Sequence, residues 1–206
     1  MTTLIIARHG NTFGPDETPL RVGARSDIPL VESGKQQAQK MGEWLKQHAL
    51  IPRTIYTSEL KRTFQTAELM VNEFNIEVPI IKDQRFNEID YGPDEGKPEA
   101  EVINRIGEAA IQMWDDNAIV PNGWEVDPNI IIQNWLAFGG FIQETHNNQI
   151  ILVVTSNGTA RFSPYLLGQF EKFKAQYPIK ISTGALCILQ RAHNNWEVKR
   201  WNVRPA

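Results

Sequence analysis

An arginine and a histidine stand side by side directly after the first apolar run of the chain, at Arg8 and His9. The apolar run at residues 4–7 is typical of a buried strand, and Gly10 would let the backbone turn where that strand ends. Ligands of open α/β sheets bind at the carboxyl ends of strands, so both side chains stand where a ligand is expected. A guanidinium suits an anion, and a neutral imidazole can attack it. The alternative is a strand-end histidine that only bonds backbone carbonyls.

A second arginine, Arg62, stands in the first turn of a helix predicted after the apolar run 54–57. The apolar stripe of that helix includes Leu60 and Phe64, and Arg62 lies about 200° from Leu60, so we expect it to face away from the core. Cations in a first turn oppose the helix dipole. A bound phosphate therefore explains Lys61 and Arg62 better than helix stability does, although a solvated surface arginine is the alternative.

A candidate proton donor, Glu88, follows the third apolar run. Between Phe86 and Ile89, desolvation can raise the pKa of its carboxyl, as a general acid requires near neutral pH. A loop carboxylate in a salt bridge is the alternative, and Asp90 and Glu95 are neighbouring candidates for the same role.

Alternating apolar patterns predict how these residues are positioned. Strands are predicted at residues 4–7, 54–57, 78–81, 150–155, 185–190 and 196–201, and helices at 33–45, 60–71, 99–114 and 129–143. Ser33 and Gln36 resemble a capping box at the start of the first helix. This alternation predicts a three-layer α/β sandwich, in which a mostly parallel sheet has helices on both faces. Residues 83–128 are richer in Gly, Pro, Asp and Glu. We expect a single domain over 1–206 in which this segment is an insertion above the functional edge of the sheet.

Composition narrows the class of protein. The chain has 206 residues, of which 41% are hydrophobic and 22% charged, as is typical of soluble globular proteins. The net charge of −3 and the absence of a basic stripe argue against nucleic acid or a membrane surface as a partner. The single cysteine, Cys187, lies in an apolar run and is predicted to be a buried strand residue. Without a leader pattern or a long apolar run, we expect a cytoplasmic location.

Several ordered segments resemble the histidine phosphatase superfamily, whose fold is shared with cofactor-dependent phosphoglycerate mutases. The segments that carry the resemblance are residues 7–12, 21–30, 34–38, 58–67 and 87–96. The first contains Arg-His-Gly, the fourth Ser-Glu-Leu-Lys-Arg-Thr-Phe-Gln-Thr-Ala, and the fifth Asn-Glu-Ile-Asp-Tyr-Gly. The resemblance implies a phosphoglycerate mutase-like fold.

The resemblance also implies a phosphomonoester hydrolase. His9 would attack phosphorus and become a phosphohistidine, which splits the reaction into two steps. Glu88 would protonate the leaving oxygen and then activate water for dephosphorylation.

The phosphate ligands follow from the same resemblance. Arg8 and Arg62 would clamp the phosphoryl oxygens, and Asn11 and Thr12 could add neutral hydrogen bonds. Because two guanidiniums neutralise the phosphate, we expect no metal and no other cofactor. The expected partner is a small phosphorylated metabolite or inorganic phosphate.

One family feature is missing. The family has a second histidine after its fourth strand, with an arginine five residues further on. Aligned on Arg161, Ser156 occupies the place of that histidine and Asn157 the place of the following glycine. Both could still bind phosphate, but neither is cationic, and the loss of one such donor typically costs about 10²–10³ in rate. His146 is predicted roughly 20 Å or more away, at the opposite edge of the sheet, so we expect no replacement imidazole.

Three functions remain open at this point. A hydrolase is favoured, because a protein that only binds phosphate would not need both His9 and Glu88. The alternative is a catalytically weak or inactive phosphate- or phosphoester-binding protein of the same fold. A phosphoglycerate mutase is the least favoured, because the chain is short for that group and residues 13–16 lack its Trp-Asn element.

Overall fold

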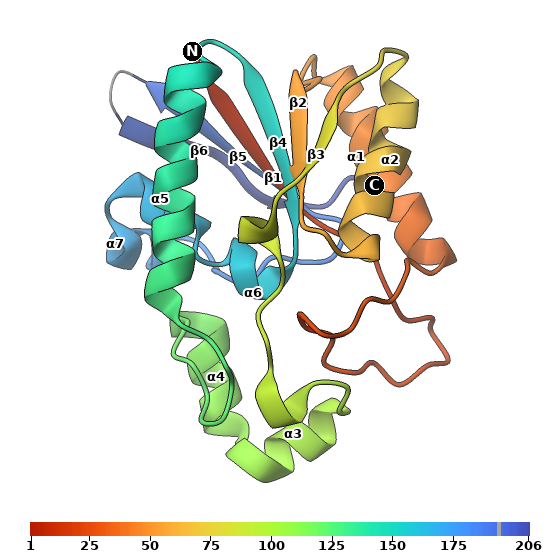
Figure 1. Cartoon of the computed structure of the whole chain (residues 1–206), viewed down its shortest axis with the longest axis vertical. Coiled ribbons are helices and arrows are strands. Elements are labelled where there is room, and N and C mark those ends of the chain that lie inside the picture. The colour runs from red at the N-terminus through yellow and green to blue at the C-terminus, as the bar shows by residue number, and fades with distance from the viewer. Residues whose placement is uncertain (193–194) are drawn as a thin grey trace.

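The computed structural model describes residues 1–192 and 195–206. Within these residues the centre of the molecule is a six-stranded sheet with the strand order β3-β2-β4-β1-β5-β6 (Figure 1). The strands are β1 (Thr3–Arg8), β2 (Thr54–Thr57), β3 (Ile80–Lys82), β4 (Ile150–Thr155), β5 (Leu186–Ala192) and β6 (Asn195–Val203). β1, β2, β3 and β4 pair in parallel, whereas β5 and β6 are antiparallel additions beside β1. The predicted α/β fold with a mostly parallel sheet is confirmed.

Helices cover both faces of the sheet. The α-helices are α1 (Glu32–Gln47), α2 (Lys61–Phe74), α3 (Glu99–Ile106), α4 (Glu108–Asn117), α5 (Pro128–Thr145), α6 (Asn157–Ala160) and α7 (Phe170–Lys174). Three short 3₁₀ helices are η1 (Gln84–Phe86), η2 (Gly92–Asp94) and η3 (Ser163–Leu167). In Figure 1, α1 and α2 lie on one side of the sheet and α5 crosses the other. None of the described helices is both long and apolar enough to cross a bilayer.

The alternation of side chains along β1 explains why the run is apolar without interruption. Ile5 and Ala7 pack in a core cluster with α1 and α2, while Leu4 and Ile6 pack in the cluster beneath α5 and α7. A parallel strand that is covered on both faces needs apolar residues at every position. Cys187 is buried in β5, as predicted, and burial raises the pKa of its thiol to about 12.

The predicted helix starts need correction. Helix α1 begins at Glu32 after Val31, and no side chain caps it, so the predicted capping box is wrong. The Ser33 hydroxyl instead accepts a hydrogen bond from Asn11 Nδ2 at 3.3 Å, which ties the loop after β1 to this helix.

The buried face of α2 also differs from the prediction. Leu60 is the N-cap residue and Phe64 is only half-buried. The residues that α2 buries are Arg62, Thr63, Thr66, Ala67, Met70 and Phe74. Leu60 is buried as predicted, but the buried side of the helix extends to Arg62, which we expected to face away from the core.

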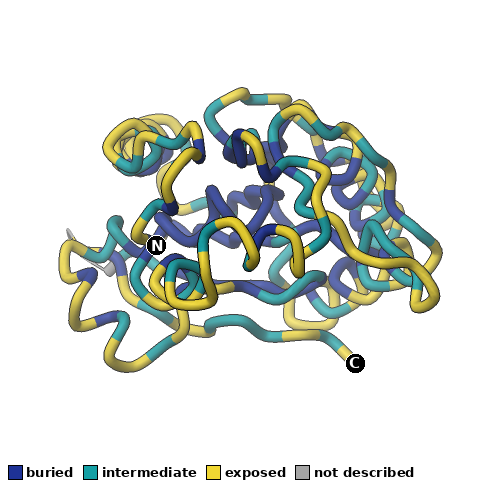
Figure 2. The backbone as a smooth tube through the Cα atoms, turned by 90° about the horizontal axis from the view of Figure 1, so that it is seen from below, coloured by how far each residue is buried: buried dark blue, intermediate teal, exposed yellow. Residues whose placement is uncertain are grey.

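The register of two neighbouring strands sets the position of the site. Arg8 of β1 pairs with Thr155 of β4, so His9 and Ser156 follow at the same end of adjacent parallel strands, which are about 4.8 Å apart. Figure 2 looks onto this end of the molecule and shows buried backbone in the middle with exposed backbone outside it. The segment 83–128, which contains α3 and α4, extends beyond this end in Figure 1.

Candidate active site

A cavity of about 650 Å³ lies at the carboxyl ends of β1 and β4. The predicted site residues that line it are Arg8, His9, Asn11, Thr12, Glu88 and Asn157. Arg62 and Ser156 are not among its lining residues in the described part of the chain. Three chain segments that are far apart in sequence, around His9, Glu88 and Asn157, thus meet around one space.

The surroundings of His9 determine the tautomer and the charge of its ring. The ring is buried, and its Nδ1 lies 2.7 Å from the Gly10 carbonyl oxygen. Since a carbonyl can only accept, Nδ1 carries the proton and Nε2 keeps the lone pair. Burial lowers the pKa of His9 well below its ordinary value, and the charges of Arg62 and Arg8 lower it further. The imidazole is therefore neutral near pH 7, as attack requires.

Gly10 is required by a close contact. A Cβ at this position would lie 2.2 Å from the Gly34 carbonyl oxygen, and a Cβ on Gly34 would lie 2.1 Å from the Asn11 carbonyl oxygen. Among the described residues, Gly10 is not one of the glycines with positive φ. The glycine is thus explained by the packing of the loop against α1, and not by the sharp turn that the sequence suggested.

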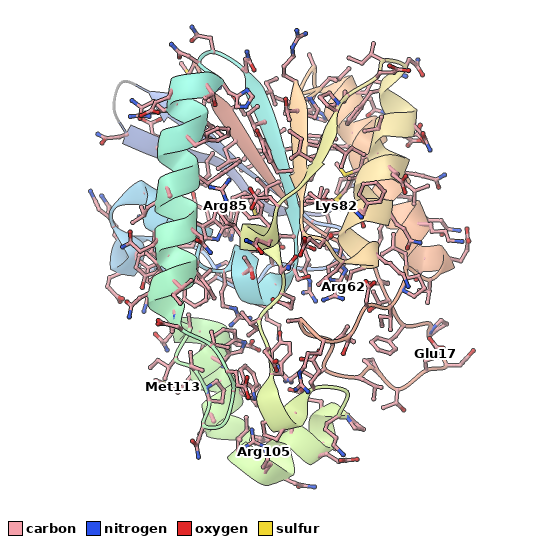
Figure 3. The ribbon with its side chains drawn as sticks, viewed as in Figure 1. Glu17, Arg62, Lys82, Arg85, Arg105 and Met113 are labelled. Atoms are coloured by element: carbon pink, nitrogen blue, oxygen red, sulfur yellow. The ribbon has the colours of Figure 1, made fainter. Side chains whose placement is uncertain are left out.

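Both predicted arginines are anchored by backbone carbonyls. Arg62 Nη1 donates to the Ser26 carbonyl at 2.6 Å and Nη2 to the Gly23 carbonyl at 3.1 Å. Arg8 Nη1 donates to the Ile181 carbonyl at 2.6 Å. Figure 3 shows Arg62 at the lower end of the sheet, beside the start of α2. These carbonyls fix both guanidiniums without neutralising their charge.

Three of the predicted phosphate ligands have a side-chain atom that is buried without a hydrogen-bond partner in the described structure. These atoms are Arg8 Nε, Arg62 Nε and Ser156 Oγ, and Arg21 Nε, also on the cavity, is buried without a partner as well. Burial lowers the pKa of both arginines, and both charges act on His9. Unpaired buried donors are rare and cost free energy. An anion with several acceptor oxygens would satisfy them.

Glu88 faces the same cavity from the other side of the sheet edge. Its Oε1 accepts from the Ile89 backbone N–H at 2.9 Å. Its Oε2 accepts from the Gly158 backbone N–H at 3.1 Å and from the Tyr91 hydroxyl at 3.4 Å. A Cβ on Gly158 would lie 2.4 Å from Glu88 Oε1. The position of the carboxyl therefore depends on a glycine at the start of α6.

Asp90 and Glu95, the two other candidates for the proton donor, do not line the cavity in the described structure. Asp90 pairs with Arg25 at 2.9 Å. Glu95 Oε1 accepts from the Gly23 backbone N–H at 3.2 Å and from the Ser26 hydroxyl at 2.8 Å. Glu95 thus fixes the loop whose carbonyls hold the guanidinium from α2.

The uncharged side chains predicted to bind phosphate differ in whether their polar atoms already have hydrogen-bond partners. Asn11 Oδ1 accepts from the Thr183 hydroxyl at 2.6 Å, so this side chain mainly organises the loop. Asn157 Oδ1 accepts from the Ile181 backbone N–H at 2.8 Å, which leaves the amide nitrogen to donate. Thr12 lines the cavity, and its hydroxyl has no bond to another described residue.

Arg161 also lines the cavity, although the sequence did not predict it as a site residue. Its guanidinium is buried, donates to the Trp114 carbonyl and to the Asn157 carbonyl, and lies 3.9 Å from the centroid of the Trp114 ring. Burial lowers its pKa to about 10. The signal in the sequence was its place five residues after Ser156.

No histidine other than His9 lines the cavity within residues 1–192 and 195–206. His146 lies on another pocket, 3.1 Å from the Tyr56 hydroxyl, and His48 lies 2.8 Å from the Trp44 carbonyl. His193 lies outside the described residues. Across those same ranges, no three His, Cys, Asp or Glu side chains are grouped as a metal site would need.

The sequence matches a known protein family over nearly its whole length. The profile of the histidine phosphatase superfamily (branch 1) matches residues 4–204, nearly the whole chain. The chain belongs to this superfamily.

Relatives within the family are phosphatases and mutases. A 2,3-bisphosphoglycerate-dependent phosphoglycerate mutase of Bifidobacterium longum is 32% identical over 127 residues, which are 61% of this chain and 50% of that protein. The chain thus spans about half the length of the curated relatives it matches. YhfR of Bacillus stearothermophilus has a TM-score of 0.78 at 25% identity, over 98% of this chain and 97% of that one. A phosphoserine phosphatase mutant of Entamoeba histolytica, in complex with phosphoserine, shares the fold with a TM-score of 0.76 at 20% identity, over 99% and 98% of the two chains.

Proposed function

We propose that the protein is a phosphomonoester hydrolase that acts through a phosphohistidine on His9. The observation that carries the proposal is the pair of buried, unpartnered guanidinium N–H groups of Arg8 and Arg62 around a neutral imidazole. A phosphoryl group supplies both the acceptor oxygens that these donors lack and the electrophile that the imidazole can attack.

The reaction takes two balanced steps. First, His9 Nε2 attacks phosphorus, the bond from phosphorus to the ester oxygen breaks, and Glu88 gives a proton to the departing alcohol. Second, a water molecule gives its proton to Glu88 and attacks phosphorus, and the phosphorus–nitrogen bond breaks. Inorganic phosphate leaves and His9 returns to its neutral form.

The remaining groups would stabilise the phosphoryl oxygens. Arg8 and Arg62 supply charge-assisted hydrogen bonds, while Thr12, Asn157 and Ser156 supply neutral ones. Ser156 stands where the family has its second histidine, so the charge on this side of the phosphoryl group is reduced. We expect a working enzyme of reduced rate, with a small phosphorylated metabolite as its substrate.

Rapid quench with a radiolabelled phosphomonoester tests the proposal. The wild type is expected to carry an acid-labile, base-stable label during turnover, and His9→Ala is expected to carry none and to lose turnover. An unlabelled wild type, or turnover that survives in His9→Ala, would refute the phosphohistidine step.

The same experiment separates the two alternatives. Calorimetric binding of phosphate without any turnover above His9→Ala would identify a phosphate-binding protein. Transfer of the label to a second position of a phosphoglycerate, without release of phosphate, would identify a mutase.

A further inference from the structure

The inner part of the site carries a surplus of positive charge. We call Arg8, Arg62, Arg161 and Glu88 the inner floor. Three guanidiniums there meet one carboxyl group, and the charge of Glu88 acts on all three of them, while Asp115 outside the floor also acts on Arg8 and Arg161. The surplus of positive charge suits a phosphomonoester, whose charge approaches −2 near pH 7.

The outer part of the same cavity has no surplus. We call Arg21, Glu99, Asp115 and Lys180 the outer wall, and all four line the cavity. Lys180 Nζ lies 2.6 Å from Asp115 Oδ2, and Arg21 is paired with Glu99. Each cation of the outer wall thus already has its own carboxylate. Glu99 and Lys180 are about half exposed, whereas Arg62 and Arg161 are buried, so the wall lies nearer the solvent, where the alcohol portion of a phosphomonoester would lie.

Asp115 holds a particular place between the two parts. It follows Trp114 on α4, and its Oδ1 lies 3.7 Å from Arg161 Nη2 while its Oδ2 binds Lys180. One carboxylate therefore offsets two cations, one in the outer wall and one in the inner floor. A second anionic group on the substrate could reach either cation only by approaching Asp115, and like charges repel strongly in such a confined space.

We propose that Asp115 is a specificity-determining residue, which restricts the site to phosphomonoesters whose alcohol carries no net negative charge. This inference rests on the proposed hydrolase function. The cavity is within the range of volumes that hold small-molecule ligands, so the phosphoryl group leaves room for a metabolite-sized alcohol. Uncharged polyol and nucleoside phosphates belong to the accepted class, and phosphorylated carboxylic acids do not.

A matched pair of substrates tests the inference. Glycerol 3-phosphate and 3-phosphoglycerate differ only in a hydroxymethyl group against a carboxylate. The wild type is expected to favour glycerol 3-phosphate at least tenfold in kcat/KM, and Asp115→Asn is expected to raise kcat/KM for 3-phosphoglycerate by roughly tenfold, mainly through KM. The value for glycerol 3-phosphate should change by less than about threefold.

Two control variants isolate the charge of Asp115. Asp116 on the same helix is exposed and its Oδ2 accepts from Gln112 Nε2 at 2.6 Å, so Asp116→Asn makes the same charge change without altering specificity. Asp115→Glu keeps the charge and is expected to keep the preference. Thermal melting shows that each variant is folded.

Dissociation constants of the two esters, measured by calorimetry, keep the test independent of turnover. If the wild type binds both but hydrolyses neither, the hydrolase proposal fails, while tighter binding of 3-phosphoglycerate by Asp115→Asn still supports the role of Asp115. A wild type that binds 3-phosphoglycerate as well as glycerol 3-phosphate overturns the inference. So does an Asp115→Asn variant that changes both substrates equally.

Discussion

The inner floor and the outer wall use similar residues under opposite electrostatic conditions. Arg8 and Arg62 in the floor are held by carbonyls and form no ion pair with a described carboxylate, whereas Lys180 and Arg21 in the wall each have a carboxylate partner. Paired ions at a surface contribute little and need no ligand. Buried cations without partners lower stability, so their arrangement is explained by what they bind. The contrast distinguishes the part of the cavity that would carry chemistry from the part that would select substrates.

The largest expected effect is the difference in kcat/KM between a variant of the inner floor and a variant of the outer wall. Arg8→Gln removes a charge-assisted donor from the floor and is expected to lower kcat/KM for glycerol 3-phosphate by about 10²–10³-fold. Lys180→Gln removes a cation from the wall and should cost less than about tenfold. Steady-state kinetics on the two purified variants make the comparison. Equal losses would show that the floor has no special role.

A methyl group added next to Glu88 should displace the carboxyl group of the floor. In Gly158→Ala the new methyl group meets Glu88 Oε1, so the carboxyl must move, and a shift of about 1 Å can cost about 10²-fold in kcat. Gly140→Ala is the matched control, because a Cβ at this exposed position of α5 has nothing within 4 Å. If Gly158→Ala is folded and fully active, Glu88 does not act from the position described.

The buried imidazole predicts how stability depends on pH. The pKa of His9 is lowered in the folded state. As the pH falls through about 6.5, the imidazole is therefore protonated in the unfolded chain but stays neutral in the folded protein. Stability from this group is present above that pH and is lost at about 1.4 kcal/mol per unit as the pH falls below it. Urea unfolding at pH 7 and pH 5.5 should show a smaller loss in His9→Asn than in the wild type. Parallel losses in the two proteins would contradict the lowered pKa.

The smallest effect concerns the unpartnered hydroxyl. Ser156→Ala removes a buried group without a partner in the described structure, so stability without ligand should be unchanged or rise by up to about 1 kcal/mol. If Ser156 donates to the phosphoryl group, kcat/KM should fall by up to about tenfold. Ser163 is equally buried and also lacks a partner there, but it lies in η3 and not directly after β4, so Ser163→Ala should change stability alone. Equal kcat/KM values for the two variants would show that Ser156 does not donate to the phosphoryl group.

The inner floor was largely predictable from the sequence because its residues adjoin regular elements. Arg8 ends a strand with an unmistakable apolar run, His9 follows it, and Arg62 lies in the first turn of a helix. At such positions an arginine or a histidine indicates an anion-binding site. The burial of Arg62 was not predicted, because the contact of α2 with α1 and the sheet decides which side of the helix is covered.

The outer wall could not be predicted in this way. Arg21, Glu99, Asp115 and Lys180 come from loops and short helices whose approach to one another depends on tertiary packing. No local pattern records a pairing across more than sixty residues. The same reason explains Gly10, where the sequence suggested backbone freedom and the structure shows a contact with a residue of another element.

The order of the strands has a consequence for how the chain acquires this site. β1 lies in the middle of the sheet, and its two partners, β4 and β5, begin only at Ile150 and Leu186. During synthesis the apolar first strand therefore stays unpaired until most of the polypeptide has been made. Such long-range pairing is slow, and intermediates that expose an unpaired apolar strand are prone to aggregate. Phosphate binding would be among the last properties to emerge, so its appearance would mark the completion of folding.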